Sequence, residues 1–528
     1  MPPGGITPTE TGRNAPGLDA EVLVVGAGPV GCWLAAELSA AGVRVLVIEA
    51  RESRAAWSRG FVVHPRTLEI FDSRGVAQRL MEDARPLPTW HFAMSARRLD
   101  FSTLPTSFPF TLLQPQARTE ELLEEHLNRH GGSVSRGQRA VGLTQHADHV
   151  AVRVLHEGAE HTLTARFVVG CDGARSAVRQ GAGIGFSGSP DTMSCPHALV
   201  ELSAPPPPEQ YMQTRENGAF FAIALPDGRF VVSTIDHAAL REPGTPWTAE
   251  MVRDSVIRIT GTDYGMGEPE RISMLGNSAK QAHRYRDRRV LLAGDAAHVH
   301  YPMGGQGMNL GVQDAHNLAW RLAAAVRAER GRTGSAELPD ALLDGYEAER
   351  RPVGERVLED VRAQMALVMA TGADGVALRS RFEALLSEHP AVHLQYALRL
   401  SGLNVRYPQP GDGDGDERLG ARVPDLLLEL PADDASGADA AAGTRLYDLL
   451  SEIGPARFVR LSVSAEAGPG DGQDEQVVNI AARSVLGPDW ALRAGWGRAE
   501  TVLIRPDGHV VDISPLPAPA RAEGGGAP

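Results

Sequence analysis

Residues 26–31 read Gly-Ala-Gly-Pro-Val-Gly, which is the spacing of a phosphate-binding loop. An apolar run precedes the loop, an Ala- and Leu-rich stretch follows it, and a second apolar run ends in Glu49. This order predicts a β-α-β unit that binds a dinucleotide. Gly26 would allow the tight turn, Gly28 the approach of a pyrophosphate, and Gly31 close packing of helix on strand. Glu49 would accept hydrogen bonds from an unphosphorylated ribose, which favours FAD or NAD(H) over NADP(H).

Two further motifs follow apolar runs that predict strands. Asp172-Gly173 comes after the run at 167–170, and Gly294-Asp295 comes after the run at 289–293. A carboxylate at such a strand end can bond a ribityl hydroxyl. Residues 304–309 (Gly-Gly-Gln-Gly-Met-Asn) then offer consecutive backbone N–H groups at a predicted helix start, which suit the electron-rich edge of a flavin. Together the motifs favour FAD as the dinucleotide.

These three motifs, in this order, resemble the single-component (class A) FAD-dependent aromatic hydroxylases over most of the chain. The resemblance implies an α/β fold, with a Rossmann-like FAD-binding domain of the p-hydroxybenzoate hydroxylase type and a β-sheet substrate domain. It also implies tightly bound FAD and NAD(P)H as a transient co-substrate. In that class the reduced flavin and O2 form a C4a-hydroperoxide, which hydroxylates an electron-rich ring. Gln116 and Arg59 inherit positions near the flavin from the same resemblance.

The motifs and the resemblance together predict a set of FAD-binding residues. They are Gly26, Gly28, Pro29, Val30, Gly31, Glu49, Ala50, Arg59, Gln116, Asp172, Gly294, Asp295, Pro302, Gly304, Gly305, Gln306, Gly307, Met308 and Asn309.

The substrate pocket is less well defined by the sequence. Candidate lining residues are Trp90, Phe92, Phe220, Phe221 and Met303, and for the four aromatic residues ordinary core packing is the alternative. The sequence identifies no catalytic base. His298 and His300 have no further metal ligands beside them, so no metal site is predicted.

The chain divides unevenly into predicted domains. Residues 20–190 and 280–400 form a discontinuous FAD-binding domain, of which 91–114 belong partly to the substrate domain at 191–279. That insert carries antiparallel β-type runs. Residues 403–515 resemble the thioredoxin-like C-terminal domain of aromatic-polyketide hydroxylases and rifampicin-type monooxygenases, without a Cys pair. Residues 1–19 read as a disordered leader and 516–528 as a disordered tail. One long helix is expected over 339–371, broken or kinked at Pro352.

Composition limits the partners of the chain. The net charge of −14 argues against nucleic acid and anionic membranes, and no apolar run approaches the length of a membrane span. Three cysteines without metal or disulfide spacing fit a reducing cytoplasm. A homodimer is one assembly that such a chain could form.

The sequence therefore predicts an FAD- and NAD(P)H-dependent monooxygenase that hydroxylates a phenolic polycyclic aromatic of polyketide type. Three alternatives stay open. The first is inactivation of an aromatic antibiotic, and the second is Baeyer–Villiger oxygen insertion. The third is a flavoprotein that does not oxygenate and acts as a dehydrogenase or assembly partner.

Overall fold

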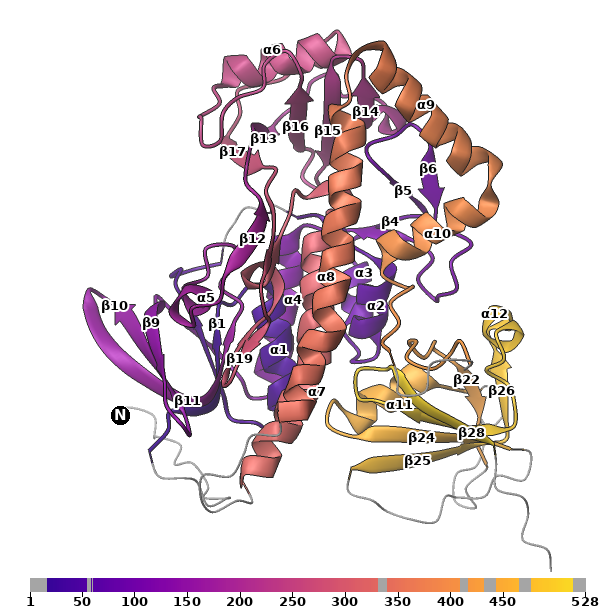
Figure 1. Cartoon of the computed structure of the whole chain (residues 1–528). Coiled ribbons are helices and arrows are strands. Elements are labelled where there is room, and N and C mark those ends of the chain that lie inside the picture. The colour runs from indigo at the N-terminus through magenta and orange to yellow at the C-terminus, as the bar shows by residue number, and fades with distance from the viewer. Residues whose placement is uncertain are drawn as a thin grey trace, which may run out of the picture.

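The computed structural model describes residues 17–54, 58, 60–330, 340–408, 416–431, 443–464 and 476–515. Figure 1 shows a lower α/β body, an upper sheet and a C-terminal unit beside them, with a long helix running from the body to the upper sheet. Arg59, most of the expected leader and the expected tail lie outside the described residues. None of the described helices combines the length and the apolarity needed to cross a membrane.

An eight-stranded sheet forms the centre of the body, and its main path runs β19-β20-β11-β1-β2-β8. Strand β1 pairs in parallel with both β2 and β11, and β9 and β10 continue the sheet antiparallel from β11. All six residues of β1 are buried, as expected for a parallel strand covered on both faces. The strands are β1 (Ala20–Val25), β2 (Val45–Glu49), β8 (Val134–Arg136), β9 (Arg139–Gln145), β10 (Val150–His156), β11 (Ala159–Gly170), β19 (Arg286–Asp287) and β20 (Val290–Leu292).

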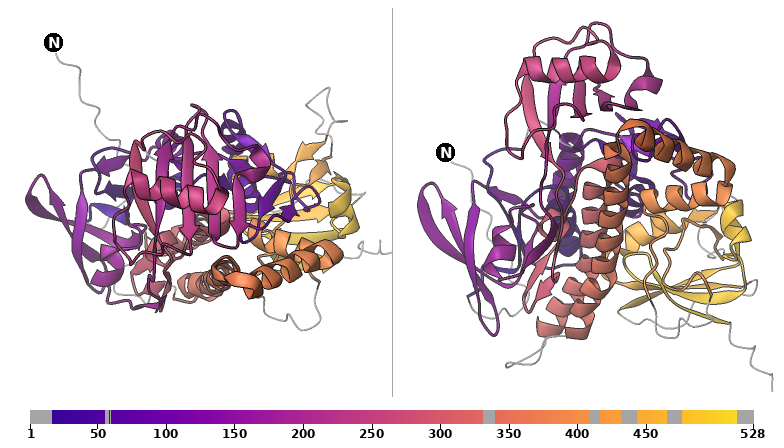
Figure 2. Two further views of the ribbon diagram at one scale, coloured as in Figure 1. Left: turned by 90° about the horizontal axis from the view of Figure 1, so that it is seen from above. Right: turned by 45° about the horizontal axis from the view of Figure 1, so that its top comes forward.

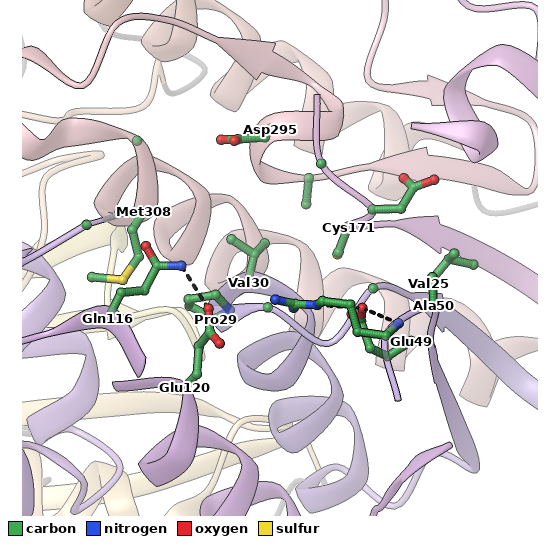
Figure 3. Close-up of a pocket in the computed structure, with 18 of the residues that line it drawn as sticks. Val25, Pro29, Val30, Glu49, Ala50, Gln116, Glu120, Cys171, Asp295 and Met308 are labelled. Atoms are coloured by element: carbon green, nitrogen blue, oxygen red, sulfur yellow. Dashed lines mark hydrogen bonds and ion pairs between the residues drawn. The ribbon is translucent and has the colours of Figure 1, made fainter. Parts of the chain in front are cut away.

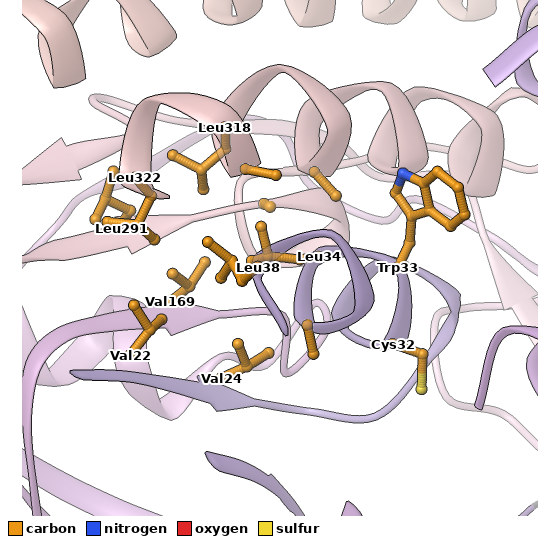
Figure 4. Packing of buried hydrophobic residues seen from close by; sticks show 14 of the residues in the cluster. Val22, Val24, Cys32, Trp33, Leu34, Leu38, Val169, Leu291, Leu318 and Leu322 are labelled. Carbon is orange, nitrogen blue, oxygen red and sulfur yellow. The ribbon is translucent and has the colours of Figure 1, made fainter. Parts of the chain in front are cut away.

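Helices α1 (Pro29–Ala40), α4 (Gln116–Arg129) and α7 (Gln306–Arg330) pack together against this sheet. Figure 4 shows the side chains of α1 between the strands and α7. The contact is made by fully buried residues, among them Val22, Val24, Trp33, Leu34, Leu38, Val169, Leu291, Leu318 and Leu322. This core fixes the position of the loop that joins β1 to α1.

Smaller elements complete the body. They are α2 (Pro65–Asp72), α3 (Ala77–Met81), α5 (Ala177–Gly181), β3 (Val62–Val63), β4 (Arg85–Leu87), β7 (Thr111–Leu113), the hairpin β5 (Thr89–His91) with β6 (Arg98–Asp100), and the three-stranded β12 (Phe186–Ser189), β18 (Ala279–Ala282) and β21 (His298–Val299). Single turns of 3-10 helix at Gly294–Ala296 and Met303–Gly305 precede α7.

The upper sheet is antiparallel, in the order β14-β15-β16-β13-β17. Its strands are β13 (Ser194–Val200), β14 (Met212–Arg215), β15 (Gly218–Ala224), β16 (Phe230–Asp236) and β17 (Arg271–Gly276). Helix α6 (Ala249–Thr260) covers the outer face. The alternation of side chains along β15 sends Phe220 to that helix and Phe221 to the opposite face, toward the body.

Helix α8 (Asp340–Met369) joins the body to the upper sheet, and α9 (Gly372–Glu388) and α10 (Pro390–Ser401) follow it. The expected long helix is confirmed. Pro352 does not end it, because α8 continues through this residue.

The C-terminal unit contains two small sheets, ordered β25-β24-β27-β28 and β23-β22-β26. Its elements are β22 (Leu427–Glu429), β23 (Thr444–Arg445), α11 (Leu446–Ile453), β24 (Phe458–Val463), β25 (Val477–Ala482), β26 (Ser484–Gly487), α12 (Asp489–Arg493), β27 (Glu500–Ile504) and β28 (Val510–Pro515). The unit has its own apolar core. Figure 2 shows it on the side of the molecule away from the β9–β10 hairpin. Its likeness to thioredoxin stays a prediction.

Candidate functional site

A cavity of about 670 Å³ lies at the carboxyl ends of β1, β2 and β11. Its walls come from the loop before α1, the end of β2, the start of α4, the turn after β11 and the start of α7. Figure 3 shows Asp295 across this cavity from Gln116 and Glu120. Carboxyl ends of parallel strands are where α/β folds bind ligands, and the volume lies in the range of cofactor pockets.

The three glycines of the first motif have different surroundings. Gly26 has a φ of +104°, and a Cβ there would meet the backbone of Cys171. A Cβ on Gly31 would collide with the carbonyl oxygen of Gly26, so helix and loop touch at this point. At Gly28 a Cβ would meet no atom within 4 Å, because this residue faces the cavity at the start of α1. A pyrophosphate fits this open position beside the unpaired N–H groups of the helix.

Glu49 has a structural role in addition to its predicted one. Its Oε2 accepts a hydrogen bond from the Ala27 backbone N–H at 2.9 Å, and its Oε1 accepts two from Arg51, at 3.0 Å from the backbone and 2.9 Å from Nε. Burial alone would raise the pKa of Glu49, but these donors hold it below its usual value. The carboxylate is therefore ionised, and its remaining lone pairs face the cavity that it lines.

Asp172 and Asp295 both line the cavity but differ in their partners. The Oδ2 of Asp172 accepts hydrogen bonds from the backbone N–H groups of Ala177, at 2.7 Å, and Val178, at 3.2 Å, at the start of α5. Its Oδ1 is buried without a partner among the described residues, and burial raises the pKa of the Asp172 carboxyl group. Asp295 is exposed to the cavity at the first turn after β20. Both carboxylates are placed to accept hydrogen bonds from ligand hydroxyls.

The loop before α7 is held in place by buried side chains. Trp90 donates a hydrogen bond from Nε1 to the carbonyl oxygen of Gly304 at 3.1 Å, and Nε2 of His64 lies 2.8 Å from the same oxygen. The Oδ1 of Asn309 accepts a hydrogen bond from the backbone N–H of His64 at 2.8 Å, and its Nδ2 donates to the backbone carbonyls of Val62 and Gly305. Asn309 is thus occupied by the protein itself, and it fixes the loop instead of lining the cavity.

His300 is a cavity-lining residue to which the sequence assigned no cofactor role. Its Nδ1 lies 2.8 Å from the Tyr301 carbonyl oxygen, and its Nε2 is buried without a partner among the described residues. Burial holds its pKa below the usual value, which keeps the ring neutral. The described residues contain no cluster of three or more potential metal ligands. His298 instead bonds to Asp314 on α7 at 2.6 Å.

A second, smaller cavity of about 70 Å³, the chamber, lies between the body and the inner face of the upper sheet. It shares part of its wall with the larger cavity, and these shared residues are Gly60, Phe61, Val62, Pro302 and Gly305. Its apolar wall includes Trp90, Phe221 and Met303, all predicted pocket residues. Polar atoms come from His197, whose Nδ1 lies 2.7 Å from the Ser233 Oγ. The two cavities thus place an apolar chamber beside the start of α7.

Most of the predicted FAD-binding residues lie together around the large cavity. Gly26, Gly28, Pro29, Val30, Glu49, Ala50, Gln116, Asp172, Asp295, Pro302, Gly305, Gly307 and Met308 line it. Gly31, Gly294, Gly304, Gln306 and Asn309 lie behind this lining and shape the loops. Direct contact with FAD stays a prediction for the first group.

Two predicted pocket residues lie elsewhere. Phe220 packs under α6, with its ring 5.5 Å from that of Tyr264, because neighbouring residues of a strand point to opposite faces. Phe92 packs against Phe382 of α9 and Tyr396 of α10, with ring centroids 5.3 and 4.8 Å away. Neither side chain lines the chamber of about 70 Å³.

Sequence reasoning missed several residues of the large cavity, including Glu120, Gln138, Arg139 and Phe61. Phe61 follows Arg59-Gly60, a segment that already suggested a place near the flavin, so its position could have been inferred. Gln138 and Arg139 precede and begin β9, and no motif in the sequence marks them.

Comparison with known proteins agrees with this geometry. A family model described as an FAD binding domain matches residues 19–361. The chain belongs to the FAD-dependent aromatic monooxygenases. It is 40% identical over 507 residues to an uncharacterized aromatic compound monooxygenase, YhjG, of Bacillus subtilis (strain 168), covering 95% of this chain and 96% of that one. It is 36% identical over 497 residues to a rifampicin monooxygenase of Streptomyces venezuelae, covering 93% and 95%.

A solved structure shares the architecture of this monooxygenase. It is OxyS anhydrotetracycline hydroxylase from Streptomyces rimosus, with a TM-score of 0.81 and 34% identity over 94% of this chain and 96% of that chain. The coverage includes most of the C-terminal unit, so the monooxygenase shares its whole arrangement with that enzyme and not the FAD-binding body alone.

Proposed function

We propose that the protein hydroxylates a phenolic polycyclic aromatic of polyketide type, with FAD as resident cofactor, NAD(P)H as transient reductant and O2 as oxidant. The single observation that carries the proposal is the shared wall of the two cavities, at Phe61, Val62, Pro302 and Gly305. A ring in the apolar chamber would lie next to whatever fills the cavity at the start of α7. The proposal includes the domain boundaries 20–190 with 280–400, 191–279 and 403–515.

The residues of the large cavity fit FAD, and we assign them as follows. Gly28 and the start of α1 would hold the diphosphate, Glu49 the adenosine ribose and Asp295 the ribityl hydroxyls. Residues 305–308 at the start of α7 would face the flavin edge with backbone N–H groups. When bound, FAD supplies electron transfer from NAD(P)H and activation of O2.

The contribution of the protein to the reaction is positioning and exclusion of water. Trp90 fixes the Gly304 carbonyl and also lines the apolar chamber, so one side chain links the two sites. Phe221 and Met303 make the chamber apolar, which keeps water from the reacting ring. His197 and Ser233 offer polar atoms for a phenolic hydroxyl.

The names of two relatives support this class of substrate. OxyS is named for anhydrotetracycline and the Streptomyces venezuelae relative for rifampicin, and both compounds are polyketide-derived aromatics. The second name favours one specific alternative, in which the oxygenated aromatic is an antibiotic from outside that is thereby inactivated.

The test is aerobic NADPH oxidation by the flavin-loaded protein with a panel of phenols of one to four rings, anhydrotetracycline and rifampicin. Product mass and hydrogen peroxide are followed together. Stimulated oxidation with a gain of one oxygen atom in a polycyclic phenol supports the proposal, whereas a gain confined to rifampicin supports the alternative. Reduction that yields peroxide and no oxygenated compound contradicts both and favours a flavoprotein that does not oxygenate. Sedimentation of the same sample decides whether the chain is a homodimer.

A further inference from the structure

The side chain of Phe61 lies where three cavities meet. It lines the large cavity, the chamber of about 70 Å³, and a third depression of about 310 Å³. Phe61 is 5% exposed, and its ring centroid lies 6.3 Å from that of His197 in the chamber wall. Ile223, which is 4% exposed, also separates the chamber from the third depression. These two side chains form the partition between an inner and an outer space.

The inner chamber is too small for the proposed substrate. An apolar cavity of roughly 150 Å³ accommodates a single benzene molecule. The chamber has about 70 Å³, so even one ring requires its wall to move, and further rings must extend beyond it. Small-molecule sites usually measure about 300–1,000 Å³.

The outer depression has the volume that the chamber lacks. It lies between the end of β15, the start of β4 and the segment from β7 to α4. Its apolar lining continues from the partition through Leu113, Ala224 and Leu225. At its rim Asp83 and Arg85 are exposed to solvent. A flat apolar body with polar groups at its outer end would match this lining.

We propose that the outer depression is the binding subsite for the distal rings of a multi-ring aromatic substrate, and that Phe61 determines how many rings the site accepts. The inference rests on the proposed function, because the reacting ring must enter the chamber beside the FAD site. Rotation of the Phe61 side chain away from Ile223 joins chamber and depression into one slot. The reacting ring then occupies the inner end, and the other rings lie over Leu113 and Leu225.

The experiment measures equilibrium binding to the FAD-loaded protein without NADPH, from the change in flavin absorbance. The probes are resorcinol, with one ring, alizarin, with three, and anhydrotetracycline, with four. Leu225→Trp and Ala84→Trp fill the outer depression, since both residues line it and neither lines the chamber. Leu225 packs in the same apolar cluster as Phe61 and Ile223. Leu240→Trp, at a residue of the same sheet region that is 48% exposed, is the matched control.

The expected result separates ligands by size. Both filling variants should weaken the binding of alizarin and anhydrotetracycline at least about tenfold, a loss of roughly 1.4 kcal/mol in binding free energy. The binding of resorcinol should stay unchanged. Phe61→Ala should strengthen binding of the larger probes, with Phe61→Leu in between, and Leu240→Trp should match the unmodified protein.

Two results would overturn the inference. One is equal weakening of all three probes, or of none, by the filling variants. The other is failure of both larger probes to bind either the unmodified protein or Phe61→Ala. The proposed function is judged separately by oxygenation: size-dependent binding without any oxygenated product would refute that function and retain the subsite. Oxygenation of large substrates at an unchanged rate in Leu225→Trp and Ala84→Trp would support the function and refute the subsite.

Discussion

Asp295 and Glu49 are both carboxylates of the large cavity, but only Glu49 is bound by the protein itself. Glu49 accepts a hydrogen bond from the Ala27 backbone N–H, so a substitution of Glu49 changes the Gly-rich loop as well as ligand contacts. Asp295 is exposed to the cavity, and its side chain accepts no hydrogen bond from the described residues. Asp295 therefore offers the cleaner test of FAD binding.

Asp295→Ala should weaken FAD binding without unfolding the protein. A lost hydrogen bond to a charged group costs about 1.5–3 kcal/mol, or roughly ten- to hundredfold in the FAD dissociation constant. Flavin retained through gel filtration, and titration of the flavin-free protein with FAD, measure the effect. Asp374→Ala, at an exposed acid in the first turn of α9, is the control. Full flavin occupancy in the Asp295 variant would contradict the assignment.

At the scale of elements, a buried ion pair joins α7 to α8 and to the loop after β20. Asp314 and Arg350 are both fully buried and meet at 2.8 Å between Oδ1 and Nε. The other oxygen of Asp314 bonds to His298 at 2.6 Å and to the Gly294 N–H at 3.3 Å. Burial alone would raise the pKa of Asp314, but Arg350 and His298 hold it below the usual value. The Asp314 carboxylate thus joins α7, α8 and the loop that begins at Gly294.

Asp314→Leu should destabilise the protein by about 3–5 kcal/mol, because it leaves Arg350 buried without its partner. The double variant Asp314→Leu with Arg350→Met should lose less, because both charges are removed together. Urea unfolding of the two variants and of Arg350→Met alone measures the coupling. If the losses of stability in the two single variants add up to the loss in the double variant, the pair is not coupled.

At the scale of the whole molecule, the C-terminal unit is fastened to the body by buried charges. Arg505 bonds to both carboxylate oxygens of Glu349 on α8, at 2.7 and 3.0 Å. Arg422 pairs with Glu69 of α2 at 2.8 Å, and Arg445 pairs with Asp72 of the same helix. Removing the unit would take one cationic partner from each of these body carboxylates, although Glu349 keeps Arg321 and Glu69 keeps Arg66.

Deletion of residues 403–528 should therefore lower solubility and thermal stability more than it lowers flavin reduction by NADPH. Arg505→Ala in the full chain should destabilise in the same direction, because Glu349 loses its bidentate partner. Arg498→Ala, whose side chain is 67% exposed, is the control. A truncated protein that stays soluble but cannot be reduced would show that the unit serves the flavin chemistry.

Four buried histidines make stability depend on pH. Burial lowers the pKa of His64, His126 and His509 to about 4 and that of His91 to about 3. Unfolded histidine binds a proton below about 6.5, so between pH 6.5 and 4 the unfolded chain holds more protons than the folded one. Stability should therefore fall as pH drops through this window.

The fall can be assigned to single residues. Each buried histidine contributes up to about 1.4 kcal/mol per pH unit below 6.5, and His126→Gln should reduce the slope by up to that amount. Urea unfolding at pH 7, 6 and 5 gives the slope. Constant stability from pH 7 to 5 would show that these rings are not held neutral.

The sequence by itself determined the local units of the predicted FAD site. The Gly-rich loop, Glu49 and the loop before α7 are coded by residues close together in the chain, and each follows a strand whose apolar run is continuous. The order of the motifs was also enough to identify the family. Local sequence suffices where backbone geometry itself makes the binding surface, as at Gly28.

Only the tertiary structure decided which side chains meet across the chain. Phe220 and Phe221 are neighbours of equal type, and the pairing of the upper sheet sends them to opposite faces. Phe92 is buried by helices more than 280 residues away in sequence. Pro352 lies inside α8, where buried contacts on both sides of it compensate for the lost hydrogen bond. Such outcomes depend on packing between distant segments, and that packing is a property of the whole fold.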